Sequence, residues 1–228
     1  MINQRNLNIT PLKDSANSLW DFLGKIGLNK EEQKESSNTN NNGNHGSKHT
    51  VYLVGISLGG YIAAQVAIEN SDMIKKLVLA GSAGLLEKPT QVLQEYFNAA
   101  MEVNPISRYE KVKRALENMY ASPSSLLPVS ISFFNNIIEK PGARYAFKEA
   151  FNTVTTTQIS SKEFKRIEDV PCLILWGDKD IAIPKMYLEK FRQCLPNAMS
   201  EEITNAGHSL VDEKTAVVYE RMRTFLMS

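Results

Sequence analysis

The amino-acid sequence predicts an α/β protein with a mostly parallel sheet and helices on its faces. Three short apolar runs have the length and composition of buried strands, and each runs into a glycine: 51–54, 77–80 and 171–177. Amphipathic helical patterns lie between them, and such alternation is typical of parallel sheets. The chain has 228 residues, of which 43% are hydrophobic, which is enough for one compact core.

Composition excludes several classes of partner. Lys and Arg total 26 against 25 Asp and Glu and are scattered, so no nucleic-acid partner is predicted. The sequence contains no apolar run long enough to span a bilayer and no signal peptide, which predicts a cytoplasmic protein with no membrane partner. Cys172, in a predicted strand, and Cys194, in a predicted helix, are expected to be free thiols in a reducing compartment.

The first 49 residues divide into two segments. Residues 1–29 carry apolar side chains at three- and four-residue spacing from Asn8 to Leu28, which predicts an amino-terminal core helix ending near Gly27. Residues 30–49 are charged and then Asn/Ser-rich, and they are expected to form a disordered loop. His45 and His49 lie in this loop without a third ligand nearby, so neither a metal site nor a cofactor is predicted.

Residues 50–84 are predicted to hold the centre of the core. The strand 51–54 runs into Gly55-Ile56-Ser57-Leu58-Gly59, and a helix follows from Tyr61 to Ile68. A serine at this kind of junction adopts a strained backbone conformation, and the glycines two residues before and after it are expected to let strand and helix approach closely. The Ser57 hydroxyl would then stand at a helix N-terminus, where negative charge is favoured.

A nucleophilic serine needs a base and an orienting acid. His208 is the one histidine outside the loop, and it precedes the predicted closing helix at 215–227. The predicted strand 171–177 ends at Asp178-Lys179-Asp180, on the sheet edge where parallel sheets place their chemistry. Both aspartates are candidates for the acid on position alone.

The three motifs in this order, Gly55 to Gly60, Trp176 to Asp180 with Pro184, and Gly207-His208, resemble the α/β-hydrolase superfamily. More narrowly, they are similar to its cap-bearing esterase, lactonase and C–C-bond hydrolase branch. The resemblance implies Ser57 as nucleophile, His208 as general base and the Leu58 N–H as an oxyanion donor. It also implies Asp180 as the acid, because that aspartate has the family's spacing to a proline. Asp178 is then a turn residue.

The same resemblance implies a domain layout. Residues 85–161 are helical and aromatic, with one apolar stripe from Val92 to Met101 and another from Tyr109 to Tyr120, and they correspond to a helical cap. The cap implies a mostly apolar acyl pocket. Residues 162–228 complete the core and carry the acid and the histidine.

The family's sheet normally has several strands before the serine, one of which leads to a second oxyanion donor. No run in residues 1–49 is typical of those strands, so the amino-terminal part of the sheet is expected to be missing. A truncated or mis-started gene model is the favoured explanation, ahead of a degenerate paralogue or a sheet completed by a partner. The open sheet edge predicts self-association.

These features predict a serine hydrolase that acts on a small carboxylic ester or lactone through Ser57, His208, Asp180 and an acyl-enzyme. The alternative is a catalytically weak or inactive truncated hydrolase fragment, or an interaction protein. Transfer of the acyl group to an alcohol instead of water stays open. Dehalogenase and epoxide hydrolase chemistry is disfavoured because those relatives use aspartate at the position of Ser57. C–C hydrolysis is disfavoured because that group tends to carry asparagine at the position of Ile56.

Overall fold

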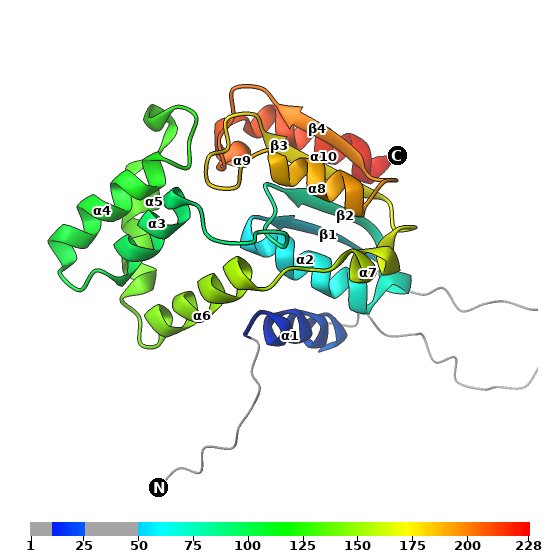
Figure 1. Ribbon diagram of the computed structural model, residues 1–228, viewed down its shortest axis with the longest axis horizontal. Coiled ribbons are helices and arrows are strands. Elements are labelled where there is room, and N and C mark those ends of the chain that lie inside the picture. The colour runs from blue at the N-terminus through cyan, green and yellow to red at the C-terminus, as the bar shows by residue number, and fades with distance from the viewer. Residues whose placement is uncertain (1–10, 26–49) are drawn as a thin grey trace, which may run out of the picture.

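The computed structural model describes residues 11–25 and 50–228, with side chains from residue 16 onward (Figure 1). The predictions for residues 26–49, including the loop and its two histidines, lie outside the described residues. Within the described ranges the sheet has four parallel strands in the order β1-β2-β3-β4: Val51–Ile56, Ile74–Ala80, Cys172–Gly177 and Met199–Ile203. This arrangement confirms the predicted fold class.

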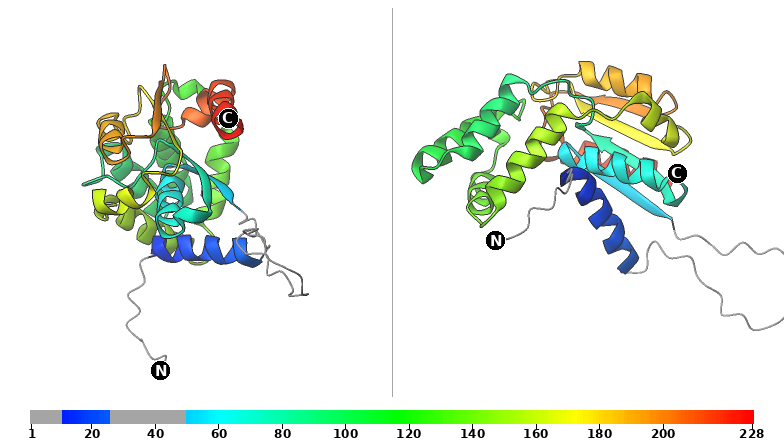
Figure 2. Two further views of the ribbon diagram at one scale, coloured as in Figure 1. Left: turned by 90° about the vertical axis from the view of Figure 1, so that its right-hand side faces the viewer. Right: turned by 60° about the horizontal axis from the view of Figure 1, so that its bottom comes forward.

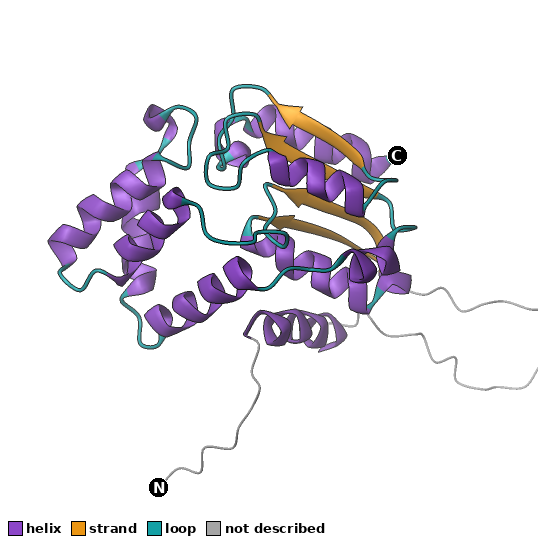
Figure 3. Cartoon of the chain, viewed as in Figure 1, coloured by secondary structure: helices purple, strands orange, loops and turns teal. Residues whose placement is uncertain are grey.

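Helices cover both faces of the sheet (Figure 3). On one face lie α2 (Leu58–Glu69), α7 (Ser161–Phe164) and α8 (Met186–Cys194), and α1 (Pro11–Lys25) packs against α2 (Figure 2). The opposite face carries α9 (Leu210–Glu213) and α10 (Thr215–Met227). Side chains of β2 alternate between the two cores, Leu77 and Leu79 facing α2 while Val78 and Ala80 face α10.

Four helices follow β2 and form a separate lobe beside the sheet, on the left of Figure 1. They are α3 (Gln91–Met101), α4 (Pro105–Glu117), α5 (Pro128–Ile138) and α6 (Ala143–Thr156). The second apolar stripe was expected to continue along one helix to Tyr120, but α4 ends at Glu117, and Met119 and Tyr120 lie in the turn beyond it. Single turns of 3₁₀ helix occur at Ser71–Met73, Pro123–Ser125 and Lys165–Ile167.

The strand β1 lies at one end of the described sheet, and none of the described helices covers one of its faces. Within the described residues it pairs only with β2. Leu53 is buried under α2, whereas Tyr52, Val54 and Ile56 on the other face are 42%, 47% and 42% exposed because α10 does not reach them. No helix in the described part of the chain is long and apolar enough to cross a membrane.

Gly55 permits the close approach of β1 and α2, and Gly60 permits the close approach of α2 and the loop after β2. A Cβ at Gly55 would lie 2.4 Å from the carbonyl oxygen of Gly59, and one at Gly60 would lie 2.2 Å from Oγ of Ser82. A Cβ at Gly59 would meet nothing within 4 Å. The prediction that the glycine after Ser57 serves the close approach was therefore wrong for Gly59. The adjacent Gly60 instead lets α2 pack against Ser82 in the loop after β2.

Alanine substitutions distinguish these glycines. Gly60→Ala should lower the free energy of unfolding by about 1–3 kcal/mol, because its methyl group collides with a buried serine. Gly59→Ala is the matched control, and it should leave stability equal or raise it by up to about 1 kcal/mol, since alanine favours helix. Urea denaturation followed by circular dichroism measures both. Equal destabilisation by the two variants would contradict this assignment.

Candidate active site

Ser57 stands between β1 and α2 in a left-handed backbone conformation, with φ 52° and ψ −118°. Its N–H donates to the carbonyl of Ala80 at 3.0 Å, and its carbonyl accepts from the N–H groups of Gly60 and Ala83, both at 3.0 Å. The predicted strain at this serine is thus present, and neighbouring backbone holds it in place. The next residue, Leu58, begins α2, and N–H groups in a first helical turn have no partner within the helix.

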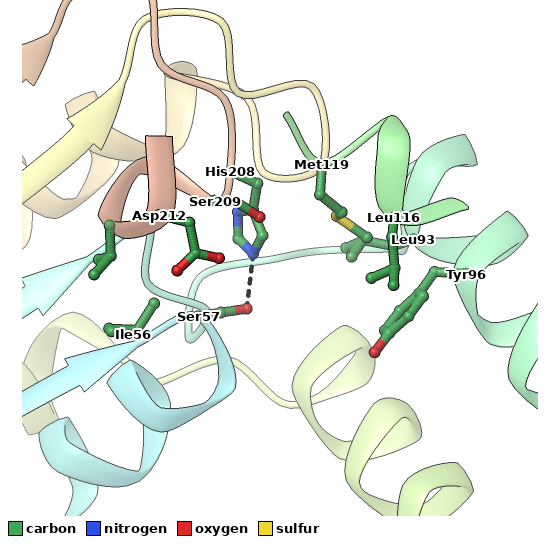
Figure 4. Close-up of a pocket in the computed structure, with 10 residues that line it drawn as sticks. Ile56, Ser57, Leu93, Tyr96, Leu116, Met119, His208, Ser209 and Asp212 are labelled. Atoms are coloured by element: carbon green, nitrogen blue, oxygen red, sulfur yellow. Dashed lines mark hydrogen bonds between the residues drawn. The ribbon is translucent and has the colours of Figure 1, made fainter. Parts of the chain in front are cut away.

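His208 and Asp180 reach Ser57 from the loops that follow β4 and β3. The Nε2 atom of His208 lies 2.8 Å from Oγ of Ser57, the contact drawn in Figure 4. The Nδ1 atom lies 2.8 Å from Oδ2 of Asp180. The structure therefore joins the three side chains singled out in the sequence into one line of hydrogen bonds.

Asp180 is held at both carboxylate oxygens. Its Oδ1 accepts from the backbone N–H of Ile183 at 2.8 Å while Oδ2 faces His208. By contrast, Oδ1 of Asp178 accepts from the N–H of Ala206 at 3.3 Å, so this carboxylate joins the turns after β3 and β4. Only Asp180 contacts the histidine.

This arrangement determines what each atom of His208 can do. Asp180 is 5% exposed and His208 is 9% exposed, so water screens their interaction weakly. An ionised carboxylate only accepts hydrogen bonds, which assigns the imidazole hydrogen to Nδ1. The lone pair on Nε2 then faces the Ser57 hydroxyl and can accept its proton.

The loop that carries His208 is fastened to the turn after α4. Glu213 accepts hydrogen bonds from two backbone N–H groups, that of Gly207 at 2.6 Å and that of Ser122 at 3.0 Å. The Ser209 N–H donates to the Met119 carbonyl at 2.9 Å. A Cβ at Gly207 would lie 2.6 Å from that same carbonyl oxygen. The four-helix lobe is therefore tied to the loop that carries the histidine.

A second tie joins Tyr120 to α9. The Tyr120 hydroxyl donates to Oδ2 of Asp212 at 2.9 Å. Burial and the hydrogen bond to Asp212 raise the pKa of Tyr120 to about 12, so it stays protonated and a donor at neutral pH.

Two cavities open beside Ser57. The larger, about 340 Å³, contains His208, Ser209 and Asp212 in its wall together with apolar side chains of the lobe (Figure 4). The smaller, about 210 Å³, is bounded by Leu58 and by hydrocarbon side chains of α3, α6 and the loops after β2 and β3. Ser57, Leu93 and Tyr96 border both cavities. The hydroxyl of Ser57 thus lies where the two cavities meet, one of which carries several polar side chains among its apolar ones.

Some residues of this site were not predicted from the sequence. Glu213 was missed because a carboxylate near a helix start has no distinctive pattern. Met119 was missed because it was assigned to the apolar stripe of a helix, whereas it lies in the turn after that helix. Tyr96 belonged to a predicted apolar stripe, but its place beside Ser57 depends on tertiary packing. Within residues 11–25 and 50–228, no group of three or more His, Cys, Asp or Glu side chains could hold a metal ion.

Comparisons with known proteins place this geometry in a family. A family profile described as alpha/beta hydrolase fold matches residues 39–215, which is most of the chain. The chain therefore belongs to the α/β-hydrolase family, which confirms the resemblance seen in the sequence.

Curated relatives are distant and longer. A cis-3-alkyl-4-alkyloxetan-2-one decarboxylase from Shewanella oneidensis is 25% identical over 203 residues, which cover 78% of this chain and 60% of the relative. An uncharacterised hydrolase of Bacillus subtilis is 22% identical over 187 residues, covering 76% of this chain and 64% of the relative. The chain thus spans about three fifths of the length of the curated relatives it matches.

Solved structures share the fold. A meta-cleavage product hydrolase from Pseudomonas fluorescens superposes with a TM-score of 0.74 at 16% identity, covering 98% of this chain and 74% of the other. A putative lipase from Acinetobacter baumannii gives a TM-score of 0.71 at 21% identity, covering all of this chain and 70% of the other. These likenesses concern the fold alone.

Replacing Glu213 tests the tie between the lobe and the histidine loop. Glu213→Ala leaves two backbone N–H groups without their acceptor, so the free energy of unfolding should fall by about 1–3 kcal/mol. Hydrogen exchange should also quicken in peptides covering 119–125 and 205–210. Glu220→Ala, which removes an exposed partner of Arg223, is the control and should change neither measurement. Unchanged exchange in Glu213→Ala would refute the tie.

Proposed function

We propose that the protein is a serine hydrolase acting on a small carboxylic ester or lactone. The observation that carries the proposal is the hydrogen-bonded line from Asp180 through His208 to Ser57, with the serine hydroxyl open to two cavities. Membership in the α/β-hydrolase family supports it. The Shewanella relative is named for an oxetan-2-one, which is a cyclic ester, and this supports the lactone class.

The first half of the reaction transfers the acyl group to the enzyme. Nε2 of His208 takes the hydroxyl proton as Oγ of Ser57 bonds to the substrate carbonyl carbon. Asp180 stabilises the resulting imidazolium, and the Leu58 N–H stabilises the negative oxygen of the tetrahedral intermediate. The intermediate then expels the alcohol oxygen, which receives the proton from Nε2 as it leaves.

The second half regenerates the enzyme. Water loses a proton to Nε2 as its oxygen bonds to the acyl carbon, the bond to Oγ of Ser57 breaks, and Oγ recovers the proton. An alcohol in place of water would give acyl transfer by the same steps. The leaving oxygen must approach Nε2, so the leaving group occupies the larger cavity, which His208 lines. The acyl group occupies the smaller, apolar cavity.

Covalent labelling tests the proposal. A fluorophosphonate should add to the purified chain once, as measured by intact mass, and Ser57→Ala and His208→Ala should abolish the reaction. Asp180→Asn should slow it by roughly three to four orders of magnitude. Asp178→Asn, which keeps its acceptor oxygen and does not touch His208, is the matched control and should react at the wild-type rate. A folded wild-type chain that takes up no label would refute the hydrolase proposal.

The alternative is a catalytically weak or inactive α/β-hydrolase relative that serves as an interaction protein. The observation favouring it is the uncovered face of β1, where Tyr52, Val54 and Ile56 are exposed at a strand that pairs on one side only among the described residues. An open apolar edge of this kind favours pairing with another chain, including a second copy.

Val54→Lys tests the alternative. A lysine on the exposed face should abolish concentration-dependent self-association in sedimentation velocity, because its charge opposes edge pairing. Met227→Lys, at a side chain that is 74% exposed near the end of α10, is the control and should associate like wild type. A wild-type chain that stays monomeric at high concentration would refute self-association through β1.

A further inference from the structure

Tyr96 of α3 lies between the two cavities with its ring held in place. The ring centroid is 5.2 Å from that of Phe134 and 5.5 Å from that of Phe147, the second pair meeting edge to face. Such aromatic contacts restrict the orientation of the ring. In Figure 4 the hydroxyl stands at the free end of this ring and is turned toward the yellow-green helix α6, whose side chains line the smaller cavity.

The hydroxyl of Tyr96 has no hydrogen-bond partner among the described residues. Tyr120, the neighbouring phenol, donates to Asp212, whereas burial alone raises the pKa of Tyr96. Tyr96 is only partly buried and borders both cavities, so an acceptor atom of a bound ligand can reach this donor. A protonated phenol offers its hydrogen to an acceptor.

The smaller cavity offers few polar side-chain groups. Apart from Ser57 and Tyr96, every side chain in its wall is hydrocarbon or phenylalanine, including Leu86, Phe151 and Val154. In the larger cavity, Ser209 and Asp212 already provide polar contacts for a leaving group. A second polar atom in the acyl part of a substrate would therefore find only Tyr96 as its side-chain partner besides the serine.

We propose that Tyr96 is a specificity-determining residue whose hydroxyl donates a hydrogen bond to an oxygen in the acyl chain. The preferred substrates are then esters or lactones whose acyl part is mainly hydrocarbon but carries one ether or keto oxygen. This inference rests on the proposed hydrolase function, and it adds the class of acyl group that the function leaves open.

Tyr96→Phe tests the proposal because it removes one oxygen and keeps the ring packing. The substrates are 4-nitrophenyl esters in isosteric pairs, methoxyacetate with butanoate, and 3-methoxypropanoate and 4-oxopentanoate with their hydrocarbon counterparts. The variant should lower kcat/KM roughly 10- to 100-fold for at least one oxygenated ester. It should leave each hydrocarbon partner within about twofold, because these form no hydrogen bond to Tyr96. Comparing variants within a pair cancels the intrinsic reactivity of the esters.

A control variant and a binding measurement separate the possible failures. Tyr145→Phe removes a hydroxyl from a side chain that is 70% exposed on α6. It should not change the ratio of kcat/KM between the oxygenated and the hydrocarbon ester of any pair. In a Ser57→Ala background, which cannot form the acyl-enzyme, Tyr96→Phe should weaken binding of the oxygenated ester by a similar factor in calorimetry.

Several results would overturn the proposal. If Tyr96→Phe lowered kcat/KM equally for both esters of every pair, the residue would have a packing role. If it lowered kcat/KM for neither ester, the hydroxyl would make no contact with the substrate. The proposal would also be overturned if the effect of Tyr96→Phe on kcat/KM varied with the leaving alcohol and not with the acyl chain. A wild-type chain inert to all esters and to fluorophosphonate refutes the hydrolase function, while the binding contrast in Ser57→Ala still decides the role of Tyr96.

Discussion

Hydrogen bonds made by the backbone of Ser57 join the parts of the molecule on which the site depends. The N–H binds the end of β2 through Ala80, and the carbonyl binds both α2 and the loop after β2. A non-glycine residue at positive φ costs about 1–3 kcal/mol, and these contacts offset that cost. The backbone conformation carries the hydroxyl beyond the end of the sheet to His208. The close packing of α2 against β1, allowed by Gly55, and against the loop after β2, allowed by Gly60, is part of the same constraint.

The position of His208 depends on contacts from several directions. Asp180 holds the ring at Nδ1, and Gly177 allows the loop before His208 to lie against the end of β3. Glu213 and the Ser209 N–H fasten that same loop to the turn after α4. Since the four-helix lobe and the histidine share these contacts, a displacement of the lobe would also displace the imidazole. The lobe is thus a support for the site as well as its cover.

The two cavities beside Ser57 differ in the polar side chains that they contain. His208 and Asp212 face one cavity, hydrocarbon side chains enclose the other, and Tyr96 stands at their boundary. Ile56 links this site to the surface because it belongs to the exposed face of β1 and also lines the larger cavity. Ile56 therefore belongs both to the cavity on which the hydrolase proposal depends and to the surface on which the interaction alternative depends.

The sequence by itself determined the parallel α/β fold, the family, a strained serine, and the histidine and aspartate that line up with it. These features follow from local signals, namely apolar strand runs, glycine spacing and polar residues placed just after strands. Only the tertiary structure decided that Gly60 rather than Gly59 permits the close packing, and that β1 exposes Tyr52 and Val54. It alone brought Glu213 to Gly207 and Tyr96 to the boundary of the cavities. Each of these depends on contacts between segments far apart in the chain, and a local pattern carries no record of which distant atoms it will meet.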